Sequence, residues 1–160
     1  MKKIIFLLFW FVFLTINLQS QTSDYNVLIS YIQTNTKLSI ENKIIAVNFW
    51  SANNKISRDA NVDLKSTCDV FKNAKLKGGS KGMIAIVICL DNDDVAADIT
   101  LKKDGVHQVL TINASELSQT SLLTNKKEGN NVIYDSNGVL INENFSNITF
   151  FESIRNLITR

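Results

Sequence analysis

The two cysteines, Cys68 and Cys89, carry the most distinctive side-chain chemistry of this 160-residue chain. They do not form a Cys-x-x-Cys motif, and both lie in apolar segments, where a free cysteine usually packs as a small hydrophobic residue. A disulfide between them is the alternative, and it requires Cα atoms within about 7 Å. His107 is the single histidine, so a four-ligand zinc site is not expected.

Two further segments have residue types that bind ions or phosphates in other proteins. The acidic run 91–94 lacks the glycine and the distal glutamate of a calcium loop, so we expect it to end a strand and begin a helix. The glycine-rich segment 78–82 lacks the spacing of a phosphate-binding loop and follows a predicted helix instead of preceding one. The sequence therefore predicts neither a metal site nor a cofactor.

The elements that would position any site begin with two apolar runs, 44–50 and 83–90, typical of strands buried on both faces of a sheet. Between them a helix is predicted from Lys55 to Leu76, with Asn54 as its N-cap. Its apolar stripe is predicted to contain Ile56, Ala60, Leu64, Cys68 and Phe71.

The remaining segments alternate in type. Apolar spacing predicts helices over 24–34, 95–103, 115–124 and 148–158, and a strand over 106–112. Residues 132–145 form a predicted hairpin, because Asn137-Gly138 is a strong turn signal. This order predicts an α/β fold with a central mixed sheet and helices on both faces.

Residues 1–21 have the layout of a secretory signal peptide: Lys2 and Lys3, then a long apolar run, then polar residues. Cleavage is expected near Ser20 or Gln21, giving a periplasmic or secreted protein; the alternative is an uncleaved membrane anchor. Without Lys2 and Lys3, the remaining basic residues equal the 15 acidic ones. A nearly neutral chain gives no support for nucleic-acid binding.

Three short strings resemble the TlpA- and ResA-related periplasmic thioredoxin-like oxidoreductases. Val-Asn-Phe-Trp-Ser-Ala at 47–52 resembles the strand before the redox site, and Ile-Cys-Leu-Asp at 88–91 resembles the next strand. Residues 131–138 resemble the strand and turn of the C-terminal hairpin. The resemblance implies a thioredoxin-like three-layer sandwich over residues 44–160, preceded by an N-terminal extension over 22–43 that contains the short helix.

The chain departs from this family at the redox site itself. The two positions of the family's Cys-x-x-Cys motif are Asn54 and Ser57, separated by Lys55 and Ile56. Thiol exchange needs a thiolate, which neither side chain supplies. The chain has no proline, and Gly129 or Asn130 stands in the neighbourhood of the family's cis-proline. We therefore do not expect thiol-disulfide oxidoreductase activity.

The expected function is that of an exported, non-catalytic protein that binds a protein or peptide partner of the cell envelope through the former active-site loop. The residues proposed for that surface are Trp50, Asn53, Asn54, Lys55, Arg58 and Gly129. In the alternative arrangement Trp50 packs in the core and Arg58 pairs with Asp59 or Asp91. The alternative functions are an envelope enzyme of another class that uses the same loop, and a membrane-tethered structural module.

Overall fold

The computed structural model describes residues 23–76, 79–145 and 149–158, so the predicted signal segment 1–21 lies outside the described residues. The fold is built on a five-stranded sheet with the order β3-β2-β1-β4-β5. β1 pairs in parallel with β2 and β2 with β3, whereas β4 is antiparallel to both β1 and β5. The strands are β1 (Ile44–Trp50), β2 (Met83–Cys89), β3 (Leu110–Asn113), β4 (Asn131–Tyr134) and β5 (Leu140–Glu143).

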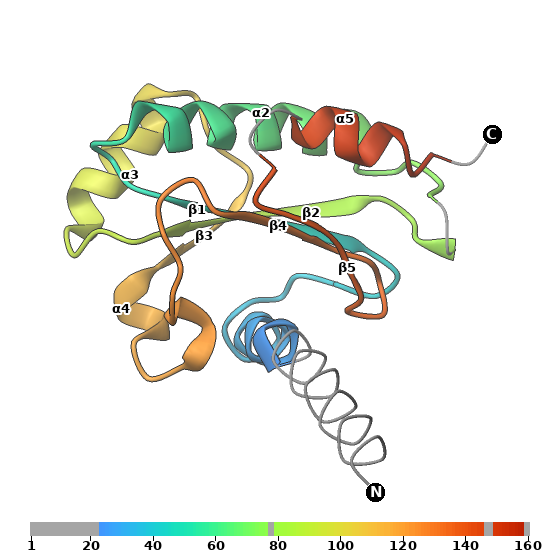
Figure 1. Ribbon diagram of the computed structural model, residues 1–160, viewed down its shortest axis with the longest axis horizontal. Helices are drawn as coiled ribbons and strands as arrows, with labels where there is room; N and C mark the ends of the chain where they lie inside the picture. The colour runs from blue at the N-terminus through green and yellow to red at the C-terminus, as the bar shows by residue number, and fades with distance from the viewer. Residues whose placement is uncertain (1–22, 77–78, 146–148, 159–160) are drawn as a thin grey trace, which may run out of the picture.

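Helices cover both faces of this sheet, as predicted. Above it in Figure 1 lie α2 (Lys55–Phe71) and α5 (Phe150–Arg155), and α3 (Asp94–Lys103) packs into the same core cluster. Below it lie the N-terminal helix, residues 23–35, and α4 (Ala114–Leu117), with the short 3-10 helix η2 (Ser121–Leu123). None of the helices in the described ranges is long and apolar enough to cross a membrane.

The two central strands are buried on both faces, which confirms the interpretation of their apolar runs. Every residue of β1 and β2 is buried. Because successive side chains of a strand point to opposite faces, Ala46 and Trp50 join the cluster under α2 and α5, whereas Ile45 and Val47 join the cluster under the N-terminal helix. The sheet therefore separates two hydrophobic cores.

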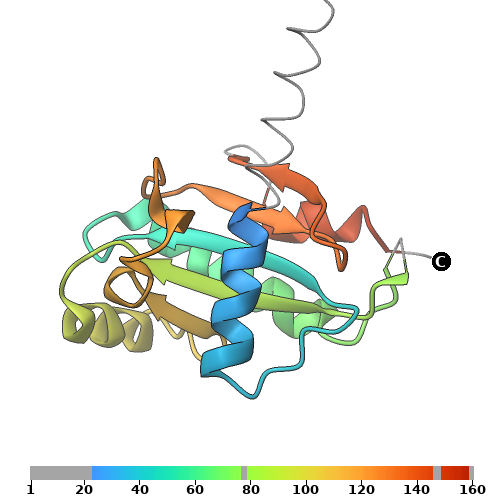
Figure 2. The same ribbon diagram turned by 90° about the horizontal axis from the view of Figure 1, so that it is seen from below.

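The N-terminal helix lies across the strands on the lower face (Figure 2). Leu28 and Ile32, one turn apart on the same side of the helix, are almost fully buried against the sheet. Asp24 forms an ion pair with Lys126, in the connection between η2 and β4. The helix within the predicted extension 22–43 thus contributes side chains to one of the two cores.

Several predicted boundaries were wrong. α2 ends at Phe71 instead of Leu76, because Lys75 and Leu76 form β-bridges with Lys81 and Ile158. The strand predicted from residue 106 begins only at Leu110, after a residue with a positive φ of 61°, Gln108.

The helix predicted over 115–124 is two short helices. Thr120 has an extended conformation, and its hydroxyl caps η2 by accepting a hydrogen bond from the amide of Leu122. The last helix, predicted over 148–158, is confined to α5.

The buried face of α2 shares Leu64 and Phe71 with the predicted stripe but differs from it in the first turns. Ile56 is 80% exposed, and the buried residues of the helix are Ser57, Asn61, Leu64, Thr67 and Phe71. Polar partners cause the difference in the first turns, because Ser57 and Asn61 accept hydrogen bonds from groups in and just after β1. The apolar pattern alone could not predict these polar contacts on the buried face of the helix.

Candidate functional site

Asn54, which the sequence resemblance places at the first cysteine position of the redox motif, caps α2, as predicted. Its Oδ1 accepts a hydrogen bond from the amide of Ser57 at 3.0 Å, which satisfies one of the free N–H groups in the first turn of the helix. Its Nδ2 donates to Glu128 Oε2 at 2.8 Å. Both ends of the Asn54 amide are therefore engaged in holding the loop, the helix and the segment before Gly129 together.

Ser57, which the resemblance places at the second cysteine position, is completely buried. Its Oγ donates to the carbonyl of Asn54 at 3.0 Å and accepts from the amide of Ser51 at 3.2 Å. Asn48 in β1 donates from its side-chain amide to the carbonyl of Ser57 at 2.8 Å. Because the partners of this hydroxyl among the described residues are backbone groups, and the side chain is buried, Ser57 is a structural residue in this arrangement.

The loop between β1 and α2 is also fixed from β2. Asp91, two residues after β2, accepts hydrogen bonds from Ser51 Oγ and from the amide of Ala52, both at 2.7 Å. This carboxylate thus holds the ends of the two parallel strands together beside the loop. The alternative prediction offered Asp91 as a partner for Arg58, but the Asp91 carboxylate binds Ser51 and Ala52 instead.

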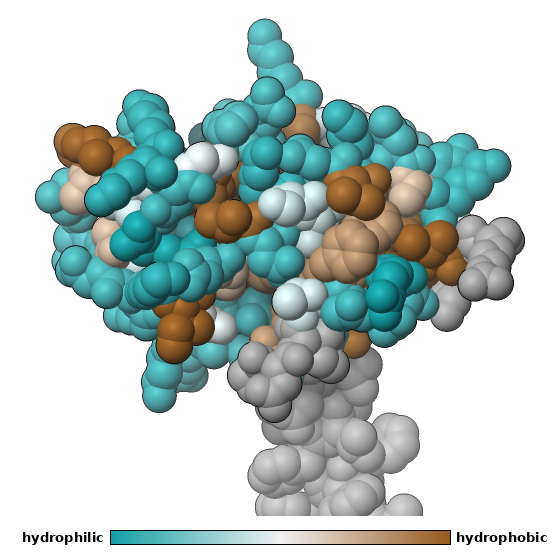
Figure 3. Space-filling view, turned by 90° about the horizontal axis from the view of Figure 1, so that it is seen from above, coloured by the Kyte–Doolittle hydropathy of each residue, from teal (hydrophilic) through white to brown (hydrophobic). Residues whose placement is uncertain are grey.

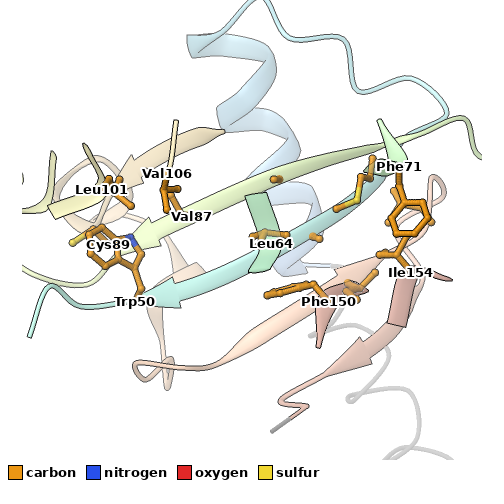
Figure 4. Packing of buried hydrophobic residues seen from close by; sticks show 14 of the residues in the cluster. Trp50, Leu64, Phe71, Val87, Cys89, Leu101, Val106, Phe150 and Ile154 are labelled. Carbon is orange, nitrogen blue, oxygen red and sulfur yellow. The ribbon is translucent and has the colours of Figure 1, made fainter. Parts of the chain in front are cut away.

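Trp50 and Arg58 do not form part of an exposed binding surface. Trp50 is fully buried and lies beside Cys89 in the upper core (Figure 4). The guanidinium of Arg58 forms two hydrogen bonds with Asp104, at the end of α3: 2.7 Å from Nε and 2.5 Å from Nη2. The alternative for Trp50 is the one observed, whereas both sequence-based partners of Arg58, Asp59 and Asp91, were wrong.

The other residues of the predicted surface are closer to solvent. Asn53 and Lys55 are exposed, and Lys55 pairs with Asp59 one turn later on α2. Gly129 lies beside the end of β1, where its amide donates to the carbonyl of Phe49 at 2.7 Å. Its φ of 83° suits glycine, although a Cβ at this position would meet no atom within 4 Å.

Both cysteines are free, so the disulfide alternative is not observed. Cys89 is fully buried, and burial raises the pKa of its thiol to about 11. Burial also raises the pKa of Cys68 on α2. At neutral pH both groups are therefore neutral thiols, unlike the thiolates that attack disulfides. Within the described ranges, no three His, Cys, Asp or Glu residues are grouped so that they could hold a metal ion.

A groove of about 310 Å³ opens beside the first turn of α2, between α2 and the start of α5. We call it the α2–α5 groove. It is lined by Ile56, Asp59, Ala60, Asp63, Gly129, Asn131, Phe145, Thr149 and Phe150. Most of the upper surface over these helices is hydrophilic, with hydrophobic residues exposed in separate patches (Figure 3). The groove is thus a partly apolar depression on a polar face.

The aromatic and acidic residues of the groove come from separate parts of the chain. The ring of Phe145 packs edge-on against that of Phe150, with 4.9 Å between the centroids. Asp63 Oδ2 accepts a hydrogen bond from the amide of Phe150 at 2.7 Å, and so ties α2 to the start of α5. Asn131 fixes the chain near Phe145 by accepting from the Phe145 amide at 2.9 Å.

Sequence reasoning found Asn54, Lys55 and Gly129 at or beside this groove but missed its acidic and aromatic wall. Asp63 and Phe145 have no local motif, and the tertiary fold alone brings them together. The one residue in the sequence that pointed to the groove was Ile56, an apolar residue in the first turn of α2. The predicted apolar stripe assigned Ile56 to the core instead.

No protein-family model matches the chain, and no curated protein matches it in sequence. Solved structures do match it in fold. The thioredoxin domain of a thiol-disulfide oxidoreductase from Bacteroides vulgatus has a TM-score of 0.60 and 13% identity, over 75% of this chain and 82% of that one.

Two further structures give the same result. A thioredoxin-like protein from Parabacteroides distasonis has a TM-score of 0.53 and 23% identity, over 68% of this chain and 79% of the other. A secreted disulfide oxidoreductase from Mycobacterium tuberculosis has a TM-score of 0.55 and 11% identity, over 74% and 84%. At these sequence identities the similarity concerns the fold alone. Together with the mixed sheet covered on both faces, this similarity shows that the chain has a thioredoxin-like fold.

Proposed function

We propose that this protein is an exported, non-catalytic binding protein that holds a peptide segment of an envelope partner in the α2–α5 groove. The observation that carries the proposal is the contrast between the two halves of the former redox site. The polar side-chain atoms of Asn54 and Ser57 form hydrogen bonds with the loop, the helix and Glu128. The depression beside them remains open and presents Ile56 to solvent.

An exposed isoleucine at the rim of a groove favours contact with an apolar group of a partner. Ile56 is more exposed than any other large hydrophobic residue of the described chain, at 80%. Burying an aliphatic side chain of this size contributes about 1.5–3 kcal/mol. Gly129 also lines the groove and has no side chain that would narrow it.

Export is proposed from the sequence of residues 1–21, which have the order of a secretory signal peptide. The similar Mycobacterium tuberculosis oxidoreductase is a secreted protein. The mass of the mature chain tests this part: a start near Gln21 supports a periplasmic or secreted protein, and an intact Met1 supports the membrane-anchored alternative.

Peptide display tests the binding function. We expect a random-peptide library selected on the wild-type protein to yield peptides that bind Ile56→Gln about tenfold more weakly, since a neutral polar side chain replaces the apolar contact. Val95→Gln is the matched control, because Val95 is also a highly exposed residue, at 70%, but lies on α3 outside the groove.

A parallel assay of insulin reduction with dithiothreitol is expected to show no turnover above background. Thiol-dependent turnover by the wild-type protein would contradict the non-catalytic assignment. Peptides that bind Ile56→Gln as tightly as the wild type would contradict the location of the site.

A further inference from the structure

The acidic side of the α2–α5 groove contains a carboxylate, Asp63, that forms no ion pair within the described residues. Asp63 is half-buried, and its carboxylate accepts hydrogen bonds from the backbone amides of Phe150 and Phe151 at the start of α5. Burial is the main cause that raises the pKa of Asp63, ahead of the backbone hydrogen bonds that lower it. A partly desolvated carboxylate of this kind gains from an approaching cation.

A second carboxylate lines the same groove. Asp59 precedes Asp63 by one turn of α2, so the two lie on the same side of the helix, where like charges repel. Lys55 pairs with Asp59, but both side chains are largely exposed, at 81% and 63%. Exposed pairs of this kind contribute little, so a partner's cation can compete for Asp59.

The aromatic wall completes a site for a basic side chain. Phe145 is partly exposed and lines the same groove as these carboxylates. An aromatic ring attracts a guanidinium or ammonium group placed over its face. The groove therefore combines two carboxylates, an aromatic ring and the exposed aliphatic side chain of Ile56.

We propose that the α2–α5 groove selects peptide segments in which an arginine or lysine adjoins an apolar residue. Asp63 and Asp59 hold the cation, and Ile56 contacts the apolar side chain. This inference rests on the proposed peptide-binding function and names the class of peptide that the groove prefers. It follows from charge complementarity, since the side chains that line the groove include two carboxylates and no lysine or arginine.

Two peptides that differ in one charge test the proposal. Acetyl-Gly-Leu-Arg-Gly-amide and its citrulline counterpart have nearly the same shape, but only the first is cationic. Each is titrated into the ¹⁵N-labelled protein, and the amide shifts of Ile56 and Gly129 report binding in the groove. We expect the arginine peptide to bind about fivefold more tightly than the citrulline peptide.

Substitutions identify the carboxylates responsible. Asp63→Asn keeps an oxygen that can accept the Phe150 hydrogen bond but removes the charge, and we expect it to abolish most of the fivefold preference. Asp59→Asn, at an exposed position that does not endanger folding, is expected to reduce the preference in part. Asp69→Asn is the matched control, because Asp69 also pairs with a lysine one turn earlier on α2 but lies outside the groove.

The outcomes separate the two proposals. Equal binding of both peptides in the groove, or a preference that survives both Asp63→Asn and Asp59→Asn, overturns the charge selection and leaves peptide binding intact. If neither peptide shifts the groove amides while displayed peptides still depend on Ile56, the arginine-apolar class is wrong. If no peptide of any kind depends on Ile56, the proposed function itself fails.

Discussion

At the scale of single residues, Asn54 explains how this fold keeps the start of α2 without a cysteine. A side-chain oxygen at this position satisfies the amide of Ser57, and the remaining amide group reaches Glu128. Asn is among the best N-cap residues because its short side chain can reach back to the first turn of the helix. The position thus has a structural role in this chain, whereas the sequence resemblance predicts a reactive thiol there in the oxidoreductase family.

The cap gives a direct prediction for stability. We expect Asn54→Ala to lower the free energy of unfolding by about 1 kcal/mol, because the amide of Ser57 loses its acceptor. Asn54→Ser is the control, since its hydroxyl can still accept this hydrogen bond. Urea unfolding followed by circular dichroism measures both variants; equal losses would show that the cap is not the cause.

At the scale of elements, α2 is positioned by polar contacts at its start and by an ion pair to its neighbour. The Arg58–Asp104 pair joins the first turns of α2 to the end of α3, and both side chains are mostly shielded from solvent. Asp91 fixes the intervening loop to β2. These contacts set the direction of α2, and therefore which of its residues face the α2–α5 groove.

The ion pair predicts a stability difference that depends on pH. The guanidinium of Arg58 lowers the pKa of Asp104 from its ordinary value of 3.8. Because the folded-state pKa is depressed, the carboxylate stabilises the protein above about pH 4 and loses this contribution as the pH falls through the folded value.

We therefore expect Asp104→Asn to be less stable than the wild type at pH 7, and the difference to shrink towards pH 3. Thermal unfolding across this range measures it. Asp98→Asn, which removes an exposed pair on the same helix, is the control and should change little at either pH. A constant difference between Asp104→Asn and the wild type would argue against the ion pair as its source.

At the scale of the whole molecule, the sheet needs a cover on each face, and the N-terminal helix supplies much of the lower one. Leu28 and Ile32 pack in a cluster with buried residues of both central strands. The upper cluster is formed with α2, α3 and α5. The two cores share the strands but no helix. Each face of the sheet therefore depends on its own helices to exclude water from its core.

A core substitution in this helix tests its contribution. Leu28→Ala is expected to destabilise the protein by about 2–5 kcal/mol, because it removes a buried side chain and leaves a cavity against the sheet. Asn26→Ala, at an exposed position of the same helix, should change stability by less than about 0.5 kcal/mol. Denaturant unfolding measures both, and a small effect of Leu28→Ala would show that the helix is a dispensable addition.

The fold class, the two central strands, the cap at Asn54 and the lack of a Cys-x-x-Cys motif could all be predicted from the linear sequence. Composition and spacing within one segment indicate the strands and the cap, and the order of the elements along the chain indicates the fold class. Helix ends were harder to predict from the sequence, because the end of α2 depends on β-bridges from Lys75 and Leu76 to residues 81 and 158.

The tertiary structure alone decided which residues form a surface. It placed Trp50 in the core and paired Arg58 with Asp104, so two residues predicted for the loop surface serve the interior and an ion pair. It also turned Ile56 outwards, because polar contacts to β1 decide which side of α2 faces the sheet. Distant segments bring Asp63 and Phe145 to the same groove, and no local pattern records such a meeting.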